Sequence, residues 1–339
     1  MKTLRAVPVE INWHPGLPIF ASEPFLRAMG DEYGWIGGID ESGQPRCVLP
    51  YTIIRRFGFR IIRFRVETIP LDAELDTGEE KLFLNSAIEC FRSRNADMII
   101  PAANTALFRT YPEGALAAPY GTFTKDLTRP ENALWSEVSE AFRKDIRRAV
   151  KGGVQISDGV KYLETAYTLT SATLQRSHQK FKSYSDFKKM IASLGNNVKI
   201  FVAVHASVVQ ACLVVPFSEH SAYTLYGGTV SQPVKGAMHL LHWEAIRQFR
   251  EMGVKKFNFT GVRIEPEKGS KQEGILTFKM RFGGRLVQGY AWKHSLHSAK
   301  FAAYSLAVRF LKGGDIVDLE RHKLTPELAE HRAQIQPCD

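Results

Sequence analysis

The stretches WIGGIDESGQPRCVLPY (residues 35–51) and VKIFVAVHASVVQACLVVPF (residues 198–217) decide the fold. Each consists of an apolar segment, a short polar turn and a second apolar segment, which is the pattern of a β-hairpin. In both, the second strand ends in a cysteine, aliphatic residues, a proline and an aromatic residue. Two hairpins matched in this way predict an internal repeat.

An amphipathic helix that leads into a strand is expected after each hairpin. The two segments are EEKLFLNSAIECFRSRNADMIIPAAN (79–104) and GAMHLLHWEAIRQFREMGVKKFNFTG (236–261). In the second, Leu241, Ala245 and Phe249 recur at helical spacing and Gly253 provides a stop. The repeated order of hairpin, helix and strand predicts a mixed α/β fold with two similarly built halves.

The composition is that of a globular protein, and the net charge favours anionic partners. Of 339 residues, 44% are hydrophobic and 24% are charged, which argues against disorder. The formal net charge of +10 favours tRNA, a nucleotide diphosphate or an anionic membrane surface as partner. The four cysteines are too far apart to indicate a zinc site or a disulfide framework. No apolar segment suggests a signal peptide or a membrane span, so a soluble, cytoplasmic protein is expected.

One long amphipathic helix is expected in DLTRPENALWSEVSEAFRKDIRRAVKGGV (126–154), capped by Thr128 and ended by Gly152 and Gly153. Basic residues, among them Arg147 and Arg148, crowd its last turns. They either interact with the helix dipole or form an anion-binding face, and the sequence leaves both interpretations open.

The segment GILTFKMRFGG (274–284) alternates apolar with polar residues, which predicts a strand with one cationic face. Gly283 and Gly284 would end this strand at a turn. Lys279 lies on the polar face. It is either a solvated lysine on an edge strand or a residue that contacts substrate.

Together with LYGGTV (225–230), these segments resemble successive landmarks of the Fem family, the aminoacyl-tRNA-dependent peptidyltransferases that build peptidoglycan cross-bridges. The resemblance spans about residues 120 to 290. It implies two tandem GNAT-like subdomains. Residues 1–125 with 296–339 would form the first, on the acceptor side, and residues 126–295 the second, on the donor side. The chain has no heptad run for the coiled-coil insertion of some members.

The resemblance further implies a cytoplasmic acyltransferase, and we expect a monomer that needs no cofactor. It would move an aminoacyl group from aminoacyl-tRNA to an amine of a peptidoglycan precursor or a similar acceptor. Because a tRNA ester is already activated, this reaction requires little beyond positioning and stabilisation of an oxyanion. The chain has neither a nucleophile elbow nor a Walker loop.

Lys279 and Tyr226 are the predicted catalytic residues. The resemblance places Lys279 near the reacting carbonyl, where its ammonium would stabilise the oxyanion or the 3′-oxygen that leaves. Tyr226 precedes a Gly-Gly pair at a strand end. Its phenol would hydrogen-bond the donor ester or orient the acceptor, although an ordinary sheet aromatic is an equal interpretation.

The predicted substrate-binding residues come from several segments. Asn258, Thr260 and Arg263 would lie near the carboxyl end of the strand that follows residues 236–251. Arginines in RRFGFRIIRFR (55–65) would hold a diphosphate or the tRNA backbone, or else pair with nearby acids such as Glu67. The full set of predicted substrate contacts is Phe278, Asn258, Thr260, Arg263, Arg147, Arg148, Arg56, Asn104 and Tyr120.

Other functions stay open on the sequence. In QPVKGA (232–237), Lys235 replaces a glycine and Pro233 removes an amide donor of the loop that binds acyl-CoA in GNAT enzymes. An acyl-CoA-dependent N-acyltransferase, aminoacylation of a small amine metabolite, and an inactive RNA-binding protein are the alternatives. No metal site is predicted, because His239 and His242 have no evident third ligand. The basic amphipathic segment 292–314 would pack on the first subdomain or touch a membrane.

Overall fold

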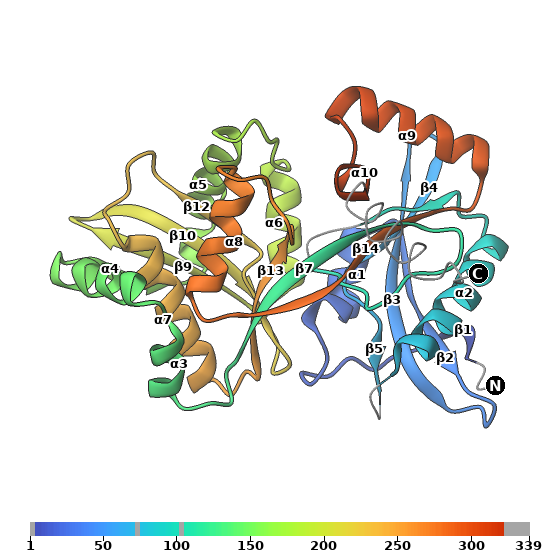
Figure 1. The fold of residues 1–339 in the computed structure, drawn as a ribbon, viewed down its shortest axis with the longest axis horizontal. Helices are drawn as coiled ribbons and strands as arrows, with labels where there is room; N and C mark the ends of the chain where they lie inside the picture. The colour runs from blue at the N-terminus through green and yellow to red at the C-terminus, as the bar shows by residue number, and fades with distance from the viewer. Residues whose placement is uncertain (1–3, 72–74, 102–104, 322–339) are drawn as a thin grey trace, which may run out of the picture.

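The computed structural model describes residues 4–71, 75–101 and 105–321, and these residues have a mixed α/β fold (Figure 1). Within these ranges, ten strands form one large sheet that runs through both halves of the molecule, and four strands form a smaller sheet. No coiled coil is among the described helices. The predicted fold class is therefore confirmed.

The large sheet joins the two halves through two long strands. The β14 strand lies between β6 and β7, so a segment near the end of the chain pairs with two segments from its first half. The predicted hairpin at residues 35–51 is formed by β2 and β3. In spatial order the strands are β1 (Arg5–Val9), β2 (Glu32–Ile39), β3 (Pro45–Arg56), β4 (Phe59–Phe64), β6 (Met98–Ile99), β14 (Arg285–Ser295), β7 (Leu116–Asp126), β13 (Lys256–Val262) and β11 (Ala222–Tyr223), with β5 (Ile69–Pro70) paired to β3.

The smaller sheet contains the second predicted hairpin, at residues 198–217. Its order is β12 (Tyr226–Thr229), β10 (Val208–Pro216), β9 (Val198–His205) and β8 (Gln155–Asp158), with all neighbours antiparallel. The segment 222–229 changes sheets. Its first part, β11, pairs in parallel with β13, and its second part, β12, pairs with β10. The two sheets therefore fork between Thr224, whose amide bonds to β13, and Leu225, whose amide bonds to β10, just before Tyr226.

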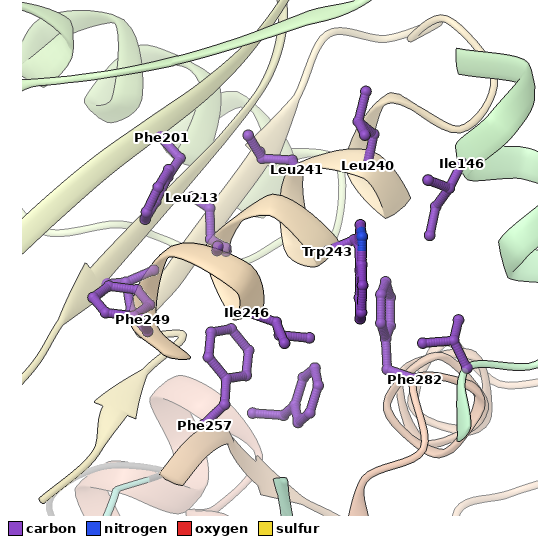
Figure 2. Packing of buried hydrophobic residues seen from close by; sticks show 14 of the residues in the cluster. Ile146, Phe201, Leu213, Leu240, Leu241, Trp243, Ile246, Phe249, Phe257 and Phe282 are labelled. Carbon is purple, nitrogen blue, oxygen red and sulfur yellow. The ribbon is translucent and has the colours of Figure 1, made fainter. Parts of the chain in front are cut away.

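Helices cover the sheets, and in the second half helices and strands both contribute to the apolar core. Figure 2 shows Leu241, Ile246 and Phe249 on α7, with Phe201 and Leu213 of the small sheet in the same cluster. The helices are η1 (Ile19–Ala21), α1 (Glu23–Met29), α2 (Thr77–Ser93), α3 (Glu131–Glu137), α4 (Glu140–Lys151), η2 (Val160–Tyr162), α5 (Leu163–Gln175), α6 (Tyr184–Ser193), α7 (Ala237–Glu251), α8 (Lys271–Arg281), α9 (Ser298–Lys312) and α10 (Ile316–Glu320).

The strand predicted at residues 274–284 is wrong, because this segment forms helix α8. Ser270 caps the helix by accepting a hydrogen bond from the Glu273 amide, and Gly283, at φ 73°, follows its end. Phe278 and Phe282 are four residues apart and pack into the core of the second half. The apolar residues of this segment fit both the strand period of about 2 and the helical period of about 3.6. The Ser270 cap and the packing of the core favour the helix.

The single helix predicted between the halves is also corrected. The chain forms two helices, α3 and α4, that are separated by an extended Val138 and by Ser139, whose hydroxyl caps α4. Pro130 occupies the cap position of α3, while Thr128 instead hydrogen-bonds the Asp126 carboxylate. The chain therefore leaves α3 at Val138 and begins α4 after Ser139. The predicted stop at Gly152 is confirmed.

Helix α9 packs on the first half, as predicted for residues 292–314. Phe301 and Tyr304 contact the cluster of Ile61 and Met98, and Lys300 pairs with Asp97 at 2.9 Å. The division of the chain into two subdomains at residues 125 and 295 stays a prediction, because the large sheet is continuous across both points.

Candidate functional site

A cavity of 530 Å³ lies between the two halves, beside the fork of the sheets, and its wall is strongly cationic. We call it the cationic cavity. Helix α1, strands β3 and β4, helix α6 and the segment before α6 contribute to its wall, and Asp186 is its acidic residue. The basic residues are Arg56, Arg63, Arg65, Lys182 and Lys189.

Burial and mutual repulsion make Arg65 and Lys182 the most perturbed cations of this cavity. Burial and the neighbouring Arg63 lower the pKa of Arg65 to about 9, and burial and Arg65 lower the pKa of Lys182 to about 8. The Arg65 guanidinium donates to the Met29 carbonyl at 2.8 Å and to the Thr52 hydroxyl at 3.2 Å, so its contacts are neutral. An anionic ligand would relieve the repulsion between these groups.

Tyr226, one of the predicted catalytic residues, lies on the wall of this cavity at the fork. The Lys182 ammonium lies 5.4 Å from the centre of its ring, and the Phe181 ring packs edge-on at 5.0 Å. Burial raises the pKa of the phenol to about 12, so it stays protonated at neutral pH and donates a hydrogen bond. Its hydroxyl approaches the Met190 sulfur at only 4.0 Å. The phenol is therefore available to a ligand.

The arginines of residues 55–65 fall into two groups. Arg55 and Arg60 pair with Glu32 at 2.6 and 3.0 Å, which is the structural role considered for the whole segment. Arg56, together with Arg63 and Arg65, lines the cationic cavity instead. Alternation along β3 and β4 separates the two groups, because Arg56 and Arg63 lie on the face opposite to that of Arg55 and Arg60.

A second cavity of 420 Å³, here called the central cavity, adjoins the first, and Thr105 lines both. Its wall includes Glu67, His220, Lys256 and Asn258. Burial raises the pKa of the Glu67 carboxyl to about 7. Burial lowers the pKa of His220 to about 4, so this imidazole is neutral. Glu67 can therefore take up or release a proton near neutral pH.

The sequence did not single out the central cavity, because its residues come from distant segments of both halves. Glu67 follows β4, His220 lies in the loop before β11 and Lys256 begins β13. The turn residues around His220 and the apolar surroundings of Glu67 are ordinary features of a sequence. The pairing of β11 with β13 brings His220 and Lys256 together, and the packing of the two halves places Glu67 on the same cavity wall.

Lys279 lies on α8 with 8% of its surface exposed. Its ammonium donates to the carbonyls of Thr260 and Gly261 at 3.0 and 2.7 Å, and burial lowers its pKa to about 7. The bland interpretation, a solvated lysine on an edge strand, is therefore wrong. Two of its N–H groups donate to the end of β13. The protonated amine therefore has a third N–H for a ligand, and the neutral amine has its lone pair.

The end of β13 carries a bulge that brings Asn258 and Thr260 together. Thr260 has φ 62°, which is unusual for a β-branched residue, and its amide donates to the Asn258 side chain at 2.7 Å. The Thr122 hydroxyl contacts both the Asn258 amide oxygen and the Thr260 carbonyl at 2.9 Å. These contacts turn the Thr260 and Gly261 carbonyls toward Lys279.

Other predicted contacts lie away from both cavities. Phe278 packs among the aromatic residues of the second core, 5.1 Å from the Phe282 ring. Arg147 stacks 5.8 Å from the centre of the Trp135 ring, and Arg148 pairs with Asp145 at 3.4 Å. These three residues have contacts within the protein, and their roles in substrate binding stay predictions.

Arg263 and Tyr120 lie near α10. Arg263 pairs with the buried Glu320 at 3.2 Å. Burial raises the pKa of the Tyr120 phenol to about 12. Asn104 lies outside the described residues, so its predicted contact stays a prediction.

The amino end of α7 is the place where a GNAT enzyme binds the pyrophosphate of acyl-CoA, and here helix α4 covers it. Gly236 caps α7 at φ 85°, and a Cβ at this position would lie 2.2 Å from the Asp145 carbonyl oxygen. Lys235 reaches the Asp145 carboxylate at 3.8 Å. A carboxylate at this position opposes the binding of a phosphate.

Two amides of this loop are bonded within the protein. The Val234 amide donates to the Gln210 side chain at 3.2 Å and the Ala237 amide to the Val234 carbonyl at 3.0 Å. Pro233 has no N–H. The loop therefore offers fewer free donors for a pyrophosphate, because two of its amides are bonded within the protein and a third position has none.

The histidine pair on α7 faces the protein interior. His242 is buried against Phe278, its Nδ1 lies 3.0 Å from the Met238 carbonyl, and burial lowers its pKa to about 4. Across the described ranges, no group of three or more possible metal ligands occurs. No helix among the described residues is both long enough and apolar enough to cross a bilayer.

Comparison with solved structures identifies the fold. The chain is similar to FemX, with a TM-score of 0.63 and 13% identity over 86% of this chain and 95% of FemX. It is also similar to the C-terminal domain of a protein assigned as a lysylphosphatidylglycerol synthetase from Agrobacterium fabrum, with a TM-score of 0.50 and 16% identity over 85% of this chain and 95% of that domain.

A conserved protein of unknown function from Bacteroides thetaiotaomicron has a TM-score of 0.51 and 10% identity, over 81% of this chain and 90% of that protein. No family model matches the sequence, and a search of curated proteins finds no match. The resemblance to the Fem family that the sequence indicated is thus confirmed at the level of the fold.

Proposed function

We propose that this protein is an aminoacyltransferase that joins an aminoacyl group from aminoacyl-tRNA to an amine acceptor. The observation that carries the proposal is the cationic cavity at the fork of the two sheets, where the cations greatly outnumber the one acid. Such a cavity suits the phosphates of a tRNA end or of a phosphorylated acceptor. The similarity to FemX in fold supports the same class of reaction.

The amino end of α7 favours an aminoacyl ester over acyl-CoA as the donor. It is covered by α4, and two of its loop amides are already bonded within the protein. A thioester donor would need this loop to open.

The proposed reaction begins when the acceptor amine loses a proton and attacks the ester carbonyl. Glu67, in the adjoining cavity, is the proposed base, because its pKa is about 7. The Tyr226 phenol would donate a hydrogen bond to the oxyanion, and Lys279 would stabilise charge on the oxyanion or on the departing 3′-oxygen. Collapse of the tetrahedral intermediate forms the amide and breaks the ester C–O bond, and the proton taken up by Glu67 passes to the departing oxygen, which leaves as the 3′-hydroxyl of the tRNA. We propose a peptidoglycan precursor amine as the acceptor.

The test is transfer of label from a pool of radiolabelled aminoacyl-tRNAs to peptidoglycan precursors. Lys189→Met, in the cavity, should lower transfer at least about tenfold. Lys188→Met is the matched control, because this exposed lysine lies beside Lys189 on α6 and does not line the cavity. Transfer that is equal in both variants would contradict the role of the cavity. Consumption of acyl-CoA in place of tRNA would contradict the donor.

The role of Lys279 predicts a specific pH dependence. An ammonium that stabilises an oxyanion acts only when protonated, so its contribution should decline as the pH rises through about 7. The ratio of the wild-type rate to that of Lys279→Gln should fall across this range. The thermal midpoint of the variant shows whether it is folded. A constant ratio would reduce Lys279 to a residue that holds the end of β13.

A further inference from the structure

Two exposed apolar elements lie beside each other at one edge of the first half. The two-residue loop between β3 and β4 exposes 83% of Phe57, and the last turns of α9 expose 82% of both Phe310 and Leu311 and 57% of Leu306. We call these four residues, with the cations Arg56, Arg309 and Lys312, the docking surface. In Figure 1, α9 crosses the outer ends of β3 and β4.

The protein core does not explain these apolar side chains. No residue of α9 is buried, although the helix is fifteen residues long. Phe57 has φ 52° and precedes Gly58 at φ 77°, positions where a tight hairpin usually has Asn-Gly. The loop thus holds a phenyl ring outward in a strained conformation, where the Arg56 guanidinium contacts it at 5.0 Å from the ring centre. An exposed aromatic residue in a backbone conformation that costs free energy suggests a contact with another molecule.

A groove connects the hairpin to the helix. This groove, of 320 Å³, is lined by Phe57, Tyr304 and Leu311, among others. Leu306 and Phe310 are four residues apart on α9 and share a more outward face of the helix, next to Leu311 but outside the groove lining. The same groove includes Ile54, Arg56 and Arg63, which also line the cationic cavity. The docking surface therefore borders the candidate functional site.

The charge around these apolar residues has one sign. Helix α9 contains no aspartate or glutamate. Acids of neighbouring elements are already bonded, since Glu32 pairs with Arg55, Asp97 with Lys300 and Asp315 with Lys293. In the described parts of the chain, Arg309 and Lys312 have no ion pair. Exposed apolar side chains flanked by unpaired cations are complementary to the surface of an anionic bilayer. The apolar side chains would contact the lipid chains, and the cations would contact the headgroups.

We propose that the docking surface binds the protein peripherally to an anionic lipid bilayer, with Phe57, Phe310 and Leu311 inserted among the lipids. A twofold contact between two copies through this surface would oppose like cations, which disfavours self-association. The proposal concerns binding alone and does not depend on the reaction proposed above.

The experiment is sedimentation of the full-length protein with vesicles, either pure phosphatidylcholine or phosphatidylcholine with about 30% phosphatidylglycerol. Wild-type protein should bind the anionic vesicles, and this binding should weaken as salt rises from about 50 to about 500 mM. Phe57→Ser/Phe310→Ser should lower the partition coefficient at least about tenfold. Arg309→Gln/Lys312→Gln should lower it about fivefold per cation on anionic vesicles only.

The control is Val160→Ser/Val208→Ser, which removes two exposed apolar residues of the second half and should leave binding unchanged. Thermal midpoints report folding, and Leu311→Ser provides an independent variant of the docking surface. Absence of wild-type binding to anionic vesicles would overturn the proposal. Equal binding by the wild type and Phe57→Ser/Phe310→Ser would also overturn it. A lipid-free dimer that becomes monomeric in the same variant would assign the surface to a second copy of the chain.

Discussion

Lys182 lowers the free energy of unfolding at neutral pH and is also proposed to bind the ligand. Its pKa in the folded protein is about 8, below the ordinary value of 10.5, because burial and Arg65 disfavour the ammonium. Between these two pH values the unfolded chain binds more protons, so this residue makes stability rise with pH, and below about pH 8 it destabilises the fold. A binding site for anions is a physical reason to retain such a cation.

Lys182→Met should therefore raise the free energy of unfolding at pH 7 by on the order of 1–3 kcal/mol. The difference from the wild type should become smaller toward pH 10. Chemical denaturation at both pH values measures the effect. Lys188→Met, at an exposed position on the same helix, should change stability little. A destabilised Lys182→Met protein at pH 7 would show that the ammonium is well paired in the folded state.

Glu67 has the opposite dependence on pH. Its pKa is raised from 4.5 to about 7 by burial, so the folded protein binds more protons than the unfolded chain between these values. Stability should then fall as the pH rises through this window, by up to about 1.4 kcal/mol per pH unit from this group. Glu67→Gln should flatten that part of the stability profile, measured by urea unfolding at pH 5 and 7.5. An unchanged profile, equal to that of the exposed control Glu164→Gln, would contradict the raised pKa.

At the scale of elements, the contact between α4 and α7 depends on the missing side chain of Gly236. An added Cβ would lie 2.2 Å from the Asp145 carbonyl oxygen, closer than any real contact, and the φ of 85° adds backbone strain. Gly236→Ala should lower the free energy of unfolding by about 3 kcal/mol or more.

Gly253→Ala is the matched control for this substitution. Gly253 has φ 77° but no neighbour within 4 Å of an added Cβ, so it isolates the cost of the backbone conformation, about 1 kcal/mol. Denaturant titration of both variants gives the difference that belongs to the packing of α4 on α7. Equal losses would mean that α4 is free to move away, and that the loop can open to an acyl-CoA donor.

The error at residues 274–284 shows the limit of sequence periodicity for short elements. Leu276, Phe278 and Met280 alternate like a strand, yet Met280 is 52% exposed and only the residues at helical spacing reach the core. The Ser270 cap lies four residues before this segment, at the end of a polar loop. A search for caps before periodicity would have favoured the helix.

At the scale of the whole molecule, the large sheet makes the halves dependent on each other. The β14 strand pairs with both β6 and β7, and without it both strands would expose unpaired backbone. A fragment of residues 1–126 should therefore be insoluble or unfolded when expressed alone, and co-expression of residues 127–339 should restore it. Solubility and circular dichroism measure this. A soluble fragment with a cooperative unfolding transition would show that the first half folds independently.

Much of the fold was predictable because it depends on short-range patterns. Hairpins at 35–51 and 198–217, and the α7 helix with its stop at Gly253, follow from alternation, helical spacing and turn residues that act over a few positions. At the site, Tyr226 and Arg56 were identified, whereas Lys182 and Glu67 were not. Nothing local distinguishes these two from other charged residues in loops.

The sequence by itself therefore determined the two hairpins, the helices that follow them and the basic character of the chain, because propensity and periodicity are properties of neighbouring residues. The tertiary structure alone decided that segment 222–229 divides between two sheets, which brings Arg65, Lys182 and Tyr226 to one cavity. It also decided that Lys279 is buried on a helix. Burial and electrostatic coupling between distant segments arise only when the chain is packed, and these two effects set the pKa values on which the proposed chemistry depends.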